Sequence, residues 1–222
     1  MSIYYPEMWH RNLLILILSL WLVIGCSEPN PPTINIHRAV QVGDLNQLER
    51  NLYWGSDVNE KGPDGLTPLH TAAQKGSLVM SRILVTHGAD LTALDPQGHT
   101  PLVKALIARN PLLADYLAKQ GAGLDANAIL HETARLGSAD RDVIDFLVKQ
   151  GANIDFQDEE GDTPLHTAVR QNQRVVVKYL LIKGARLDLV NRNGETPLGL
   201  AMVLQHDDIA RLLRQFGAPE HR

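Results

Sequence analysis

Four histidines recur along the chain, and histidine is a common ligand of zinc and a common acid–base catalyst. They are His37, His70, His131 and His166, and the last three each end a tetrapeptide of the type Thr-Pro-Leu-His or a worn variant of it. Equivalent positions of stacked units lie about 10 Å apart, whereas the ligands of one zinc ion lie about 2 Å from the metal. We therefore predict a structural role for these histidines and expect no metal site.

No other pattern of reactive residues suggests catalysis. The chain contains no nucleophile elbow, phosphate loop, paired-cysteine site or His-Glu-x-x-His. Its carboxylates are expected on surfaces, away from the apolar pockets that shift a pKa. We predict a protein that is not an enzyme, with no cofactor and no small-molecule substrate.

The tetrapeptides themselves are the strongest signal, because they return at a fixed interval. Clear copies begin at Thr67, Thr100, Thr163 and Thr196, the first two and the last two being 33 residues apart, and a worn copy begins at Ala128. A period of this length indicates stacked repeats, since one short unit cannot bury its own apolar face.

Each copy continues in the same order. Small residues follow the tetrapeptide, then a turn (Gly76, Gly137 or Asn172), then a second helix that ends at Gly-Ala, as at Gly88. Asp-Gly, Gln-Gly, Glu-Gly or Asn-Gly precedes the next Thr-Pro, which is typical of a tight turn. The threonine and proline are expected to start the first helix of each repeat.

This pattern resembles the ankyrin repeat over residues 34 to about 219. The resemblance implies an all-α solenoid of helix-turn-helix units joined by β-hairpin fingers. We predict six repeats, over residues 34–66, 67–99, 100–127, 128–162, 163–195 and 196–219. In this family the histidine of the tetrapeptide ties adjacent turns together. Polar residues in the first and last outer helices fit terminal caps.

Two departures interrupt the regular spacing. His131 follows Gly121 by only ten positions, so the third connection has lost most of its finger, and the fourth repeat gains two residues within 138–142. The missing finger leaves a notch in the row of tips. Neutral drift and a binding requirement both remain possible explanations.

The first 33 residues predict a location. An apolar run over 13–24, broken only by Ser19, is short for a membrane span and ends at Gly25 and Cys26, the one cysteine of the chain. This resembles the lipobox of bacterial lipoproteins and implies a signal peptide over 1–25, acylation of Cys26 and a Pro-rich tether over 26–33. In a two-membrane host it implies the periplasmic side of the outer membrane. An uncleaved apolar anchor is the alternative.

The resemblance to ankyrin repeats implies a protein-binding function, through finger tips and exposed positions of the first helices. The net charge is −4, whereas a nucleic-acid-binding domain is expected to be basic. The predicted binding residues share these positions, and they are Asp64, Leu66, Gln74, Lys75, Gln97, His99, Lys104, Arg135, Phe156, Asp158, Glu159, Glu160, Asp162, Arg170, Arg192 and Glu195.

One finger differs from the others in composition. Residues 155–162 carry five carboxylates and one aromatic, Phe156. Such an aromatic could anchor an interface with a basic partner or could fold onto its own hairpin. A second pair of aromatics, Tyr53 and Trp54, could pack on residues 31–36 or rest on lipid headgroups.

We predict a monomeric, lipid-anchored binding module of the envelope. It would bind and neutralise or regulate one partner protein, as an immunity protein does. An accessory or localising factor for a periplasmic enzyme, an envelope scaffold and a secreted effector that binds host proteins are the alternatives.

Overall fold

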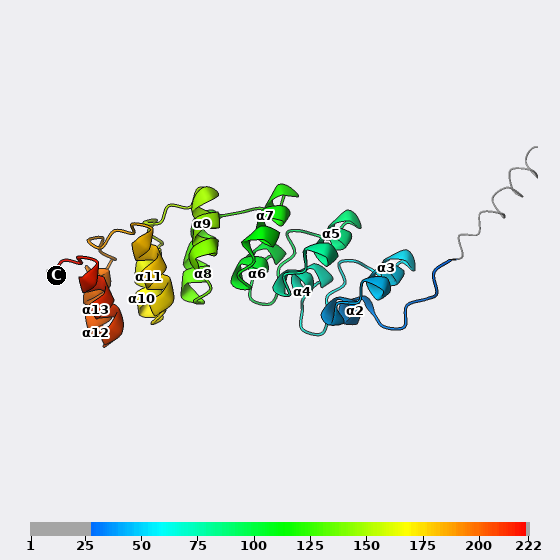
Figure 1. Ribbon diagram of the computed structural model, residues 1–222, viewed down its shortest axis with the longest axis horizontal. Helices are drawn as coiled ribbons and strands as arrows, with labels where there is room; N and C mark the ends of the chain where they lie inside the picture. Colours follow the sequence, from blue (N-terminus) through cyan, green and yellow to red (C-terminus); the bar gives the residue numbers. More distant parts are fainter. Residues whose placement is uncertain (1–27, 221–222) are drawn as a thin grey trace, which may run out of the picture.

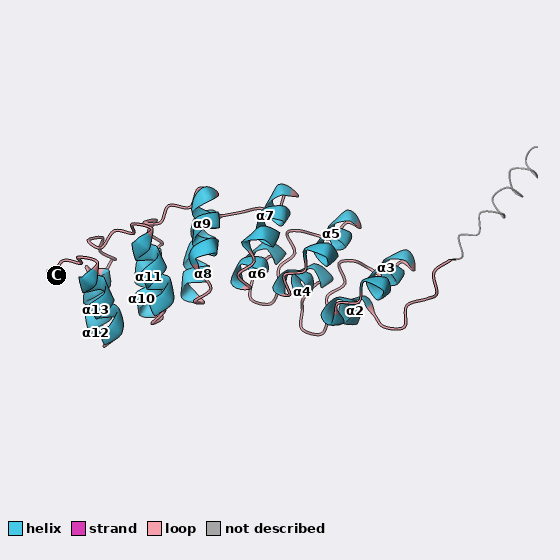
Figure 2. Cartoon of the chain, in the orientation of Figure 1, coloured by secondary structure: helices cyan, strands magenta, loops and turns pink. Residues whose placement is uncertain are grey.

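A computed structural model describes residues 28–220, which form one solenoid of helix pairs (Figures 1 and 2). The pairs follow one another along the long axis, with the first repeat at one end and the C-terminus at the other. Within these residues there are twelve helices and no strand. The first helices of the six pairs are α2 (Ile36–Val42), α4 (Pro68–Gln74), α6 (Pro101–Ile107), α8 (Ala126–Arg135), α10 (Pro164–Arg170) and α12 (Pro197–Val203). Their partners are α3 (Leu45–Tyr53), α5 (Leu78–Thr86), α7 (Pro111–Lys119), α9 (Arg141–Lys149), α11 (Arg174–Ile182) and α13 (Asp207–Gln215).

The Thr-Pro dipeptide starts four of the first helices as predicted. In α4, the Thr67 side chain accepts a hydrogen bond from the His70 amide, and Pro68 occupies the first helical turn. Thr100, Thr163 and Thr196 cap α6, α10 and α12 in the same way. Such a cap satisfies a backbone N–H that the helix leaves free, and the fixed φ of proline suits the first turn.

The leucine of each tetrapeptide builds a continuous core. Leu69, Leu102, Leu130 and Leu165 are each 0% exposed, and the small residues that follow them, such as Ala72, let neighbouring helices approach. Because every repeat packs only on its neighbours, the core runs the length of the solenoid.

The connections between repeats form turns rather than the predicted β-hairpins. We call each five-residue turn a finger, and the described chain has four, at 62–66, 95–99, 158–162 and 191–195. In each, the first amide donates to the carbonyl of the fifth residue, as Asp95 does to His99 at 3.0 Å, and a glycine such as Gly98 lies at positive φ. One such closing bond gives no strand ladder, which explains why no strand is present among the described residues.

The third connection is where the structure departs most from the regular pattern. Helix α8 has 10 residues where α4, α6, α10 and α12 have 7, and it begins at Ala126, capped by Asp125. Helix α8 thus begins two residues before the start predicted for the fourth repeat at residue 128, because one extra helical turn occupies the place of the missing finger. The two added residues lie in the α8–α9 turn, where Ser138 and Ala139 are buried.

Candidate protein-binding groove

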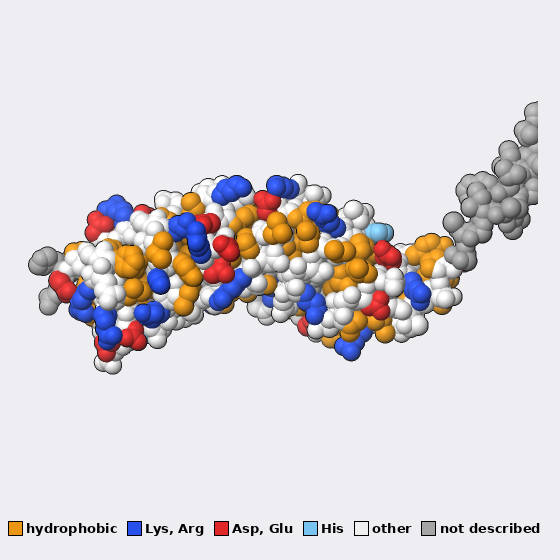
Figure 3. Space-filling view, in the orientation of Figure 1, with side chains coloured by type: hydrophobic (Ala, Val, Ile, Leu, Met, Phe, Trp, Pro, Cys, Tyr) orange, Lys and Arg blue, Asp and Glu red, His pale blue; other side chains and the backbone are white. Residues whose placement is uncertain are grey.

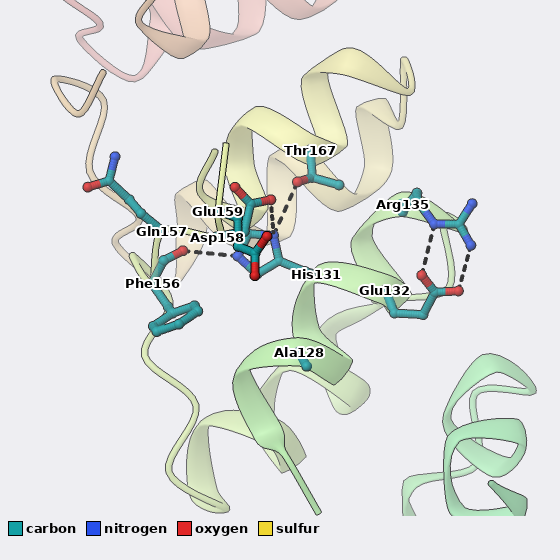
Figure 4. A pocket seen from close by; sticks show the side chains of 9 residues that line it. All are labelled: Ala128, His131, Glu132, Arg135, Phe156, Gln157, Asp158, Glu159 and Thr167. Atoms are coloured by element: carbon teal, nitrogen blue, oxygen red, sulfur yellow. Dashed lines mark hydrogen bonds and ion pairs between the residues drawn. The ribbon is translucent and has the colours of Figure 1, made fainter. Parts of the chain in front are cut away.

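Helix α8, including Ala128 of its extra turn, and the segment 156–159 border an open groove of about 600 Å³, shown in Figure 4. We call it the notch groove. Its lining comes from α8, the 158–162 finger with the two residues before it, and α10, and consists of Ala128, His131, Glu132, Arg135, Phe156, Gln157, Asp158, Glu159 and Thr167. The groove brings together two features that the sequence showed separately, the missing finger and the aromatic, acidic finger.

His131 holds the base of the groove. Its Nε2 lies 3.0 Å from the Phe156 carbonyl oxygen, which can only accept, so Nε2 carries the proton. Nδ1 lies 3.2 Å from the Thr167 hydroxyl and 3.6 Å from Asp158 Oδ2. His131 thus ties α8 to the following finger, but through Phe156 rather than through the last finger residue.

Phe156 forms one wall of the groove. Its ring meets the His131 ring edge-on, with centroids 6.2 Å apart, while the residue remains 41% exposed. The ring is thus oriented by one internal contact and keeps an open face. Such an ordered, half-exposed aromatic loses little entropy when a partner covers it.

The carboxylates of the acidic finger divide into two groups. Asp158 Oδ1 accepts from the Glu160 and Asp162 amides, and Asp162 is buried at 5% exposure with bonds from Arg170 and Asn191. These carboxylates build the finger, so the expectation that the carboxylates lie on surfaces was wrong for Asp162. Within residues 28–220, Glu159 and Glu160 are exposed and their side chains enter no ion pair.

An ion network lies on the other side of the notch. Glu132 Oε1 lies 2.9 Å from His99 Nε2 and 2.6 Å from an Arg135 nitrogen. Bonds from Arg135 lower the pKa of Glu132, with a smaller contribution from His99 and against the opposing effect of burial. Repeats three and four are therefore joined by charged side chains where a finger would otherwise lie.

The same network continues inward to Asp95, a second carboxylate wrongly expected on the surface. Its side chain is 0% exposed, and Lys104 Nζ lies 2.7 Å from Oδ2. Burial acts to raise the pKa of Asp95, but the bonds from Lys104 and from the His99 and Gln97 amides outweigh it and hold the pKa below its ordinary value. Lys104 and His99, both predicted to bind a partner, are thus engaged inside the protein.

The other predicted binding residues are spread along the solenoid. Asp64, Gln74, Lys75, Gln97, Arg170 and Arg192 are exposed, while Leu66 and Glu195 are half-buried. Asp64 also accepts the Leu66 amide, and Glu195 accepts from Asn191. Of the full predicted set, only Arg135, Phe156, Asp158 and Glu159 line the notch groove. Cys26 lies outside the described residues.

His70 and His166 carry out the structural role that the repeat pattern predicts. In each, Nδ1 meets the capping threonine and Nε2 lies 3.0 Å from a carbonyl oxygen of the next finger, that of His99 or Glu195. Burial lowers the pKa of both imidazoles, and the bonds to those carbonyls oppose this only in part. No group of three or more potential ligands among residues 28–220 is arranged to hold a metal ion.

Sequence reasoning missed Gln157 and Arg109. Gln157 Nε2 donates to the Val190 carbonyl one repeat on, as Lys61 Nζ does to that of Leu94, so the repeat spacing could have revealed it. Arg109 bonds the Gly137 carbonyl and has φ 57°, where the other repeats have glycine, asparagine or, in the last, Gln205, and no motif signals this.

None of the helices in the described part of the chain combines the length and apolar character that crossing a membrane requires.

The comparisons with known proteins identify the family. The model for ankyrin repeats (three copies) matches residues 36–128 and again 130–220, so the chain belongs to the ankyrin-repeat family. Members of this family are protein–protein interaction modules, and the matches indicate no enzymatic family.

Two solved structures illustrate the likeness. The human ASB11 ankyrin repeat domain is 27% identical with a TM-score of 0.68, covering 84% of this chain and 85% of its own. The ankyrin repeat domain of Bcl-3, a member of the IkappaB family, is 28% identical with a TM-score of 0.65, covering 86% and 89%. A search of curated proteins found no match.

Proposed function

We propose that this protein is a lipid-anchored binding module that holds one partner protein through the notch groove. The observation that carries the proposal is a groove of about 600 Å³ beside the half-exposed Phe156, next to the connection where an extra turn of α8 takes the place of a finger. A regular ankyrin connection would fill this space with its own turn. A protruding turn of a partner fits the same space.

The charges at the groove favour a basic partner. Glu159 and Glu160 are exposed without an ion pair inside residues 28–220, whereas Arg135 is already bonded to Glu132. The free charge at the rim is therefore negative. A lysine or arginine at the tip of the partner's turn would lie near these carboxylates while its stem covers Phe156.

The location is proposed from the sequence. Cys26 after the apolar run over 13–24 supports acylation, and two or more acyl chains give stable anchoring. In a two-membrane bacterium the solenoid would face the periplasm from the outer membrane.

An immunity-type role is our preferred hypothesis for the binding function. A rigid binder tethered at the membrane suits the neutralisation of a toxin that acts there. A localising factor for a periplasmic enzyme is the second candidate, and the same groove would serve it. An effector secreted toward host proteins is disfavoured by acylation, which tethers a protein to its producer.

Capture from envelope extract tests the groove. The bait is the full chain, beside a variant with Phe156→Ala, Glu159→Lys and Glu160→Lys. Asp158 is left unchanged because it holds the finger. The matched control carries Phe216→Ala, Glu49→Lys and Glu60→Lys, which alter an equally exposed phenylalanine and the same charge elsewhere.

We expect a stoichiometric partner on the parent and on the control but not on the groove variant. Equal capture by all three would keep a binding role and contradict the groove. In a separate assay, Cys26→Ser is expected to move the protein from the membrane fraction to the soluble fraction, and continued membrane association would contradict the anchor.

A further inference from the structure

The start of the described chain lies against the first repeat. The Trp54 indole Nε1 donates to the Pro29 carbonyl at 3.1 Å. Further on, the Thr33 amide donates to Gln47 Oε1 at 2.9 Å, and Asn51 Nδ2 donates to the Ile34 carbonyl at 2.8 Å. The segment from Pro29 to Ile34 is thus held on α3, so its N-terminal end has a fixed place beside Trp54.

Two aromatic rings remain exposed at this place. Tyr53 is 58% exposed and Trp54 48%, with ring centroids 6.0 Å apart and planes at 73°. The tether satisfies the indole N–H but leaves much of the ring uncovered. Hydrophobic side chains are visible at this end of the solenoid, where the described chain begins, as they are along the rest of this face (Figure 3).

The other outer helices lack such a pair. The last helical residue and the next residue are Thr86-His87 after α5, Lys119-Gln120 after α7, Lys149-Gln150 after α9, Ile182-Lys183 after α11 and Gln215-Phe216 after α13. The aromatic pair therefore does not belong to the repeat pattern. It occurs only at the end of the solenoid that carries the tether.

We propose that Tyr53 and Trp54 lie in the headgroup region of the membrane and seat the solenoid on its first repeat. This inference rests on the proposed acylation of Cys26. Pro29 lies three positions after Cys26, a span of at most about 11 Å when extended. The headgroup region on each side of the hydrocarbon core is about 5 to 8 Å deep. An acylated Cys26 therefore keeps the indole at or close to the lipid surface.

The chemistry of the pair favours lipid over a protein. Tyrosine and tryptophan combine an apolar ring with a polar group and are enriched at membrane interfaces. A stable protein interface buries about 800 Å² per partner, far more than two half-exposed rings can offer. A second copy of this chain and the unprocessed residues 1–27 are the competing occupants.

Seating of the first repeat on the membrane would also position the notch groove. The membrane-seated repeat lies at one end of the solenoid and the C-terminus at the other (Figure 1). The groove between α8 and α10 lies in the fourth and fifth pairs, and would face the aqueous phase at a distance set by the rigid repeats between. A partner would be held at a fixed height above the lipid.

The chain offers its own reporter for this proposal. Its three tryptophans are Trp9, Trp21 and Trp54, so removal of residues 1–25 leaves Trp54 alone. The full chain is produced in bacteria, and mass spectrometry establishes acylation at Cys26. The protein is then reconstituted in phosphatidylethanolamine–phosphatidylglycerol vesicles that carry spin-labelled quencher lipids.

We expect headgroup-proximal quenchers to reduce Trp54 fluorescence about twofold and the emission to shift to shorter wavelength, as for an interfacial indole. The matched control is Trp54→Phe with Phe216→Trp, which moves the reporter to a site of similar exposure, 42% against 48%, at the far end. It should show little quenching.

The possible results distinguish contact of Tyr53 and Trp54 with lipid from acylation of Cys26. An acylated protein whose Trp54 is quenched no more than the far-end reporter would overturn the inference and leave the anchor standing. A blue shift that depends on protein concentration, without quenching, would assign the pair to a second copy and overturn it as well. A chain without acyl groups on Cys26 would overturn the anchor, and the inference with it.

Discussion

Two successive junctions of the solenoid join similar helices, but one contains a finger and the other does not. Between repeats two and three, the 95–99 finger is bonded to α4 through His70 and is completed by Lys61, which bonds the Leu94 carbonyl. Between repeats three and four no finger is present, the inner helices α6 and α8 pack less extensively, and the His99–Glu132 pair bridges the gap. The comparison shows that a lost connection need not break the stack, because extra helix and charged side chains can replace it.

The largest expected difference between the junctions lies in their ion pairs. Asp95→Ala should lower the free energy of unfolding by about 4 kcal/mol, because it removes the partner of Lys104 and frees two finger amides. Glu132→Ala, at the open junction, should cost about 1 kcal/mol because its carboxylate is partly solvated. Urea unfolding of both variants checks this. Equal losses would contradict the contrast between the two junctions.

Two equivalent histidines, one at the closed junction and one beside the notch groove, should differ next. His70→Ala should cost about 3 kcal/mol, since it removes a fully buried ring that caps α4 and bonds the next finger. His131→Ala should cost about 1 kcal/mol because its ring borders the open groove. Thermal unfolding with a known enthalpy gives both values. A larger loss of unfolding free energy for His131→Ala than for His70→Ala would contradict this order and show that the groove wall stabilises the stacked repeats more.

The intact junctions should also make stability depend on pH. The pKa values of His70 and His166 lie below that of a free histidine, so the unfolded chain binds protons first as pH falls below about 6.5. Stability should thus be full above pH 6.5 and decline on acidification toward the folded pKa, by at most about 1.4 kcal/mol per pH unit for each histidine. The measurement is urea unfolding between pH 7.5 and 5.5. His70→Gln with His166→Gln should flatten the profile, and an unchanged profile would contradict the assignment.

The smallest expected effects concern the turns within repeats. Gln205 has φ 58°, so Gln205→Gly should stabilise the protein by about 0.5 to 1 kcal/mol by removing left-handed strain. Arg109→Gly, at φ 57°, should gain less because it also loses the bond from Arg109 to the Gly137 carbonyl across the open junction. Differential scanning calorimetry distinguishes the two. A larger gain for Arg109→Gly would mean that this bond contributes nothing.

The repeat fold followed from the sequence because its rules are local. Threonine caps, prolines, glycine turns and the buried leucine all recur with the period, so each copy supports the same assignment. The notch was also visible in the spacing, as was the added segment in the fourth repeat. The extra turn of α8 was not visible in the spacing. Asp125 can cap a helix and the three residues after it are compatible with one, but the repeat period alone does not distinguish them from a shortened finger.

The groove was predicted only in part, for a physical reason. Phe156 and its acidic neighbours stand out by composition, but composition cannot tell a carboxylate that folds the finger from one that is free. Asp158 and Asp162 bond backbone amides and buried side chains, and only the fold shows this. The contact of Phe156 with His131 joins residues 25 positions apart in the sequence, so it cannot be read from any single motif.

The measurement that tests the binding account most directly is the affinity of the captured partner for three forms of the protein, by titration calorimetry. These are the parent, Phe156→Ala and Phe216→Ala, since the two phenylalanines are 41% and 42% exposed. We predict that Phe156→Ala weakens binding by at least about 30-fold, as for a loss of 2 kcal/mol at an anchor, and that Phe216→Ala leaves it unchanged. Equal affinity for all three forms would contradict the notch groove as the binding site.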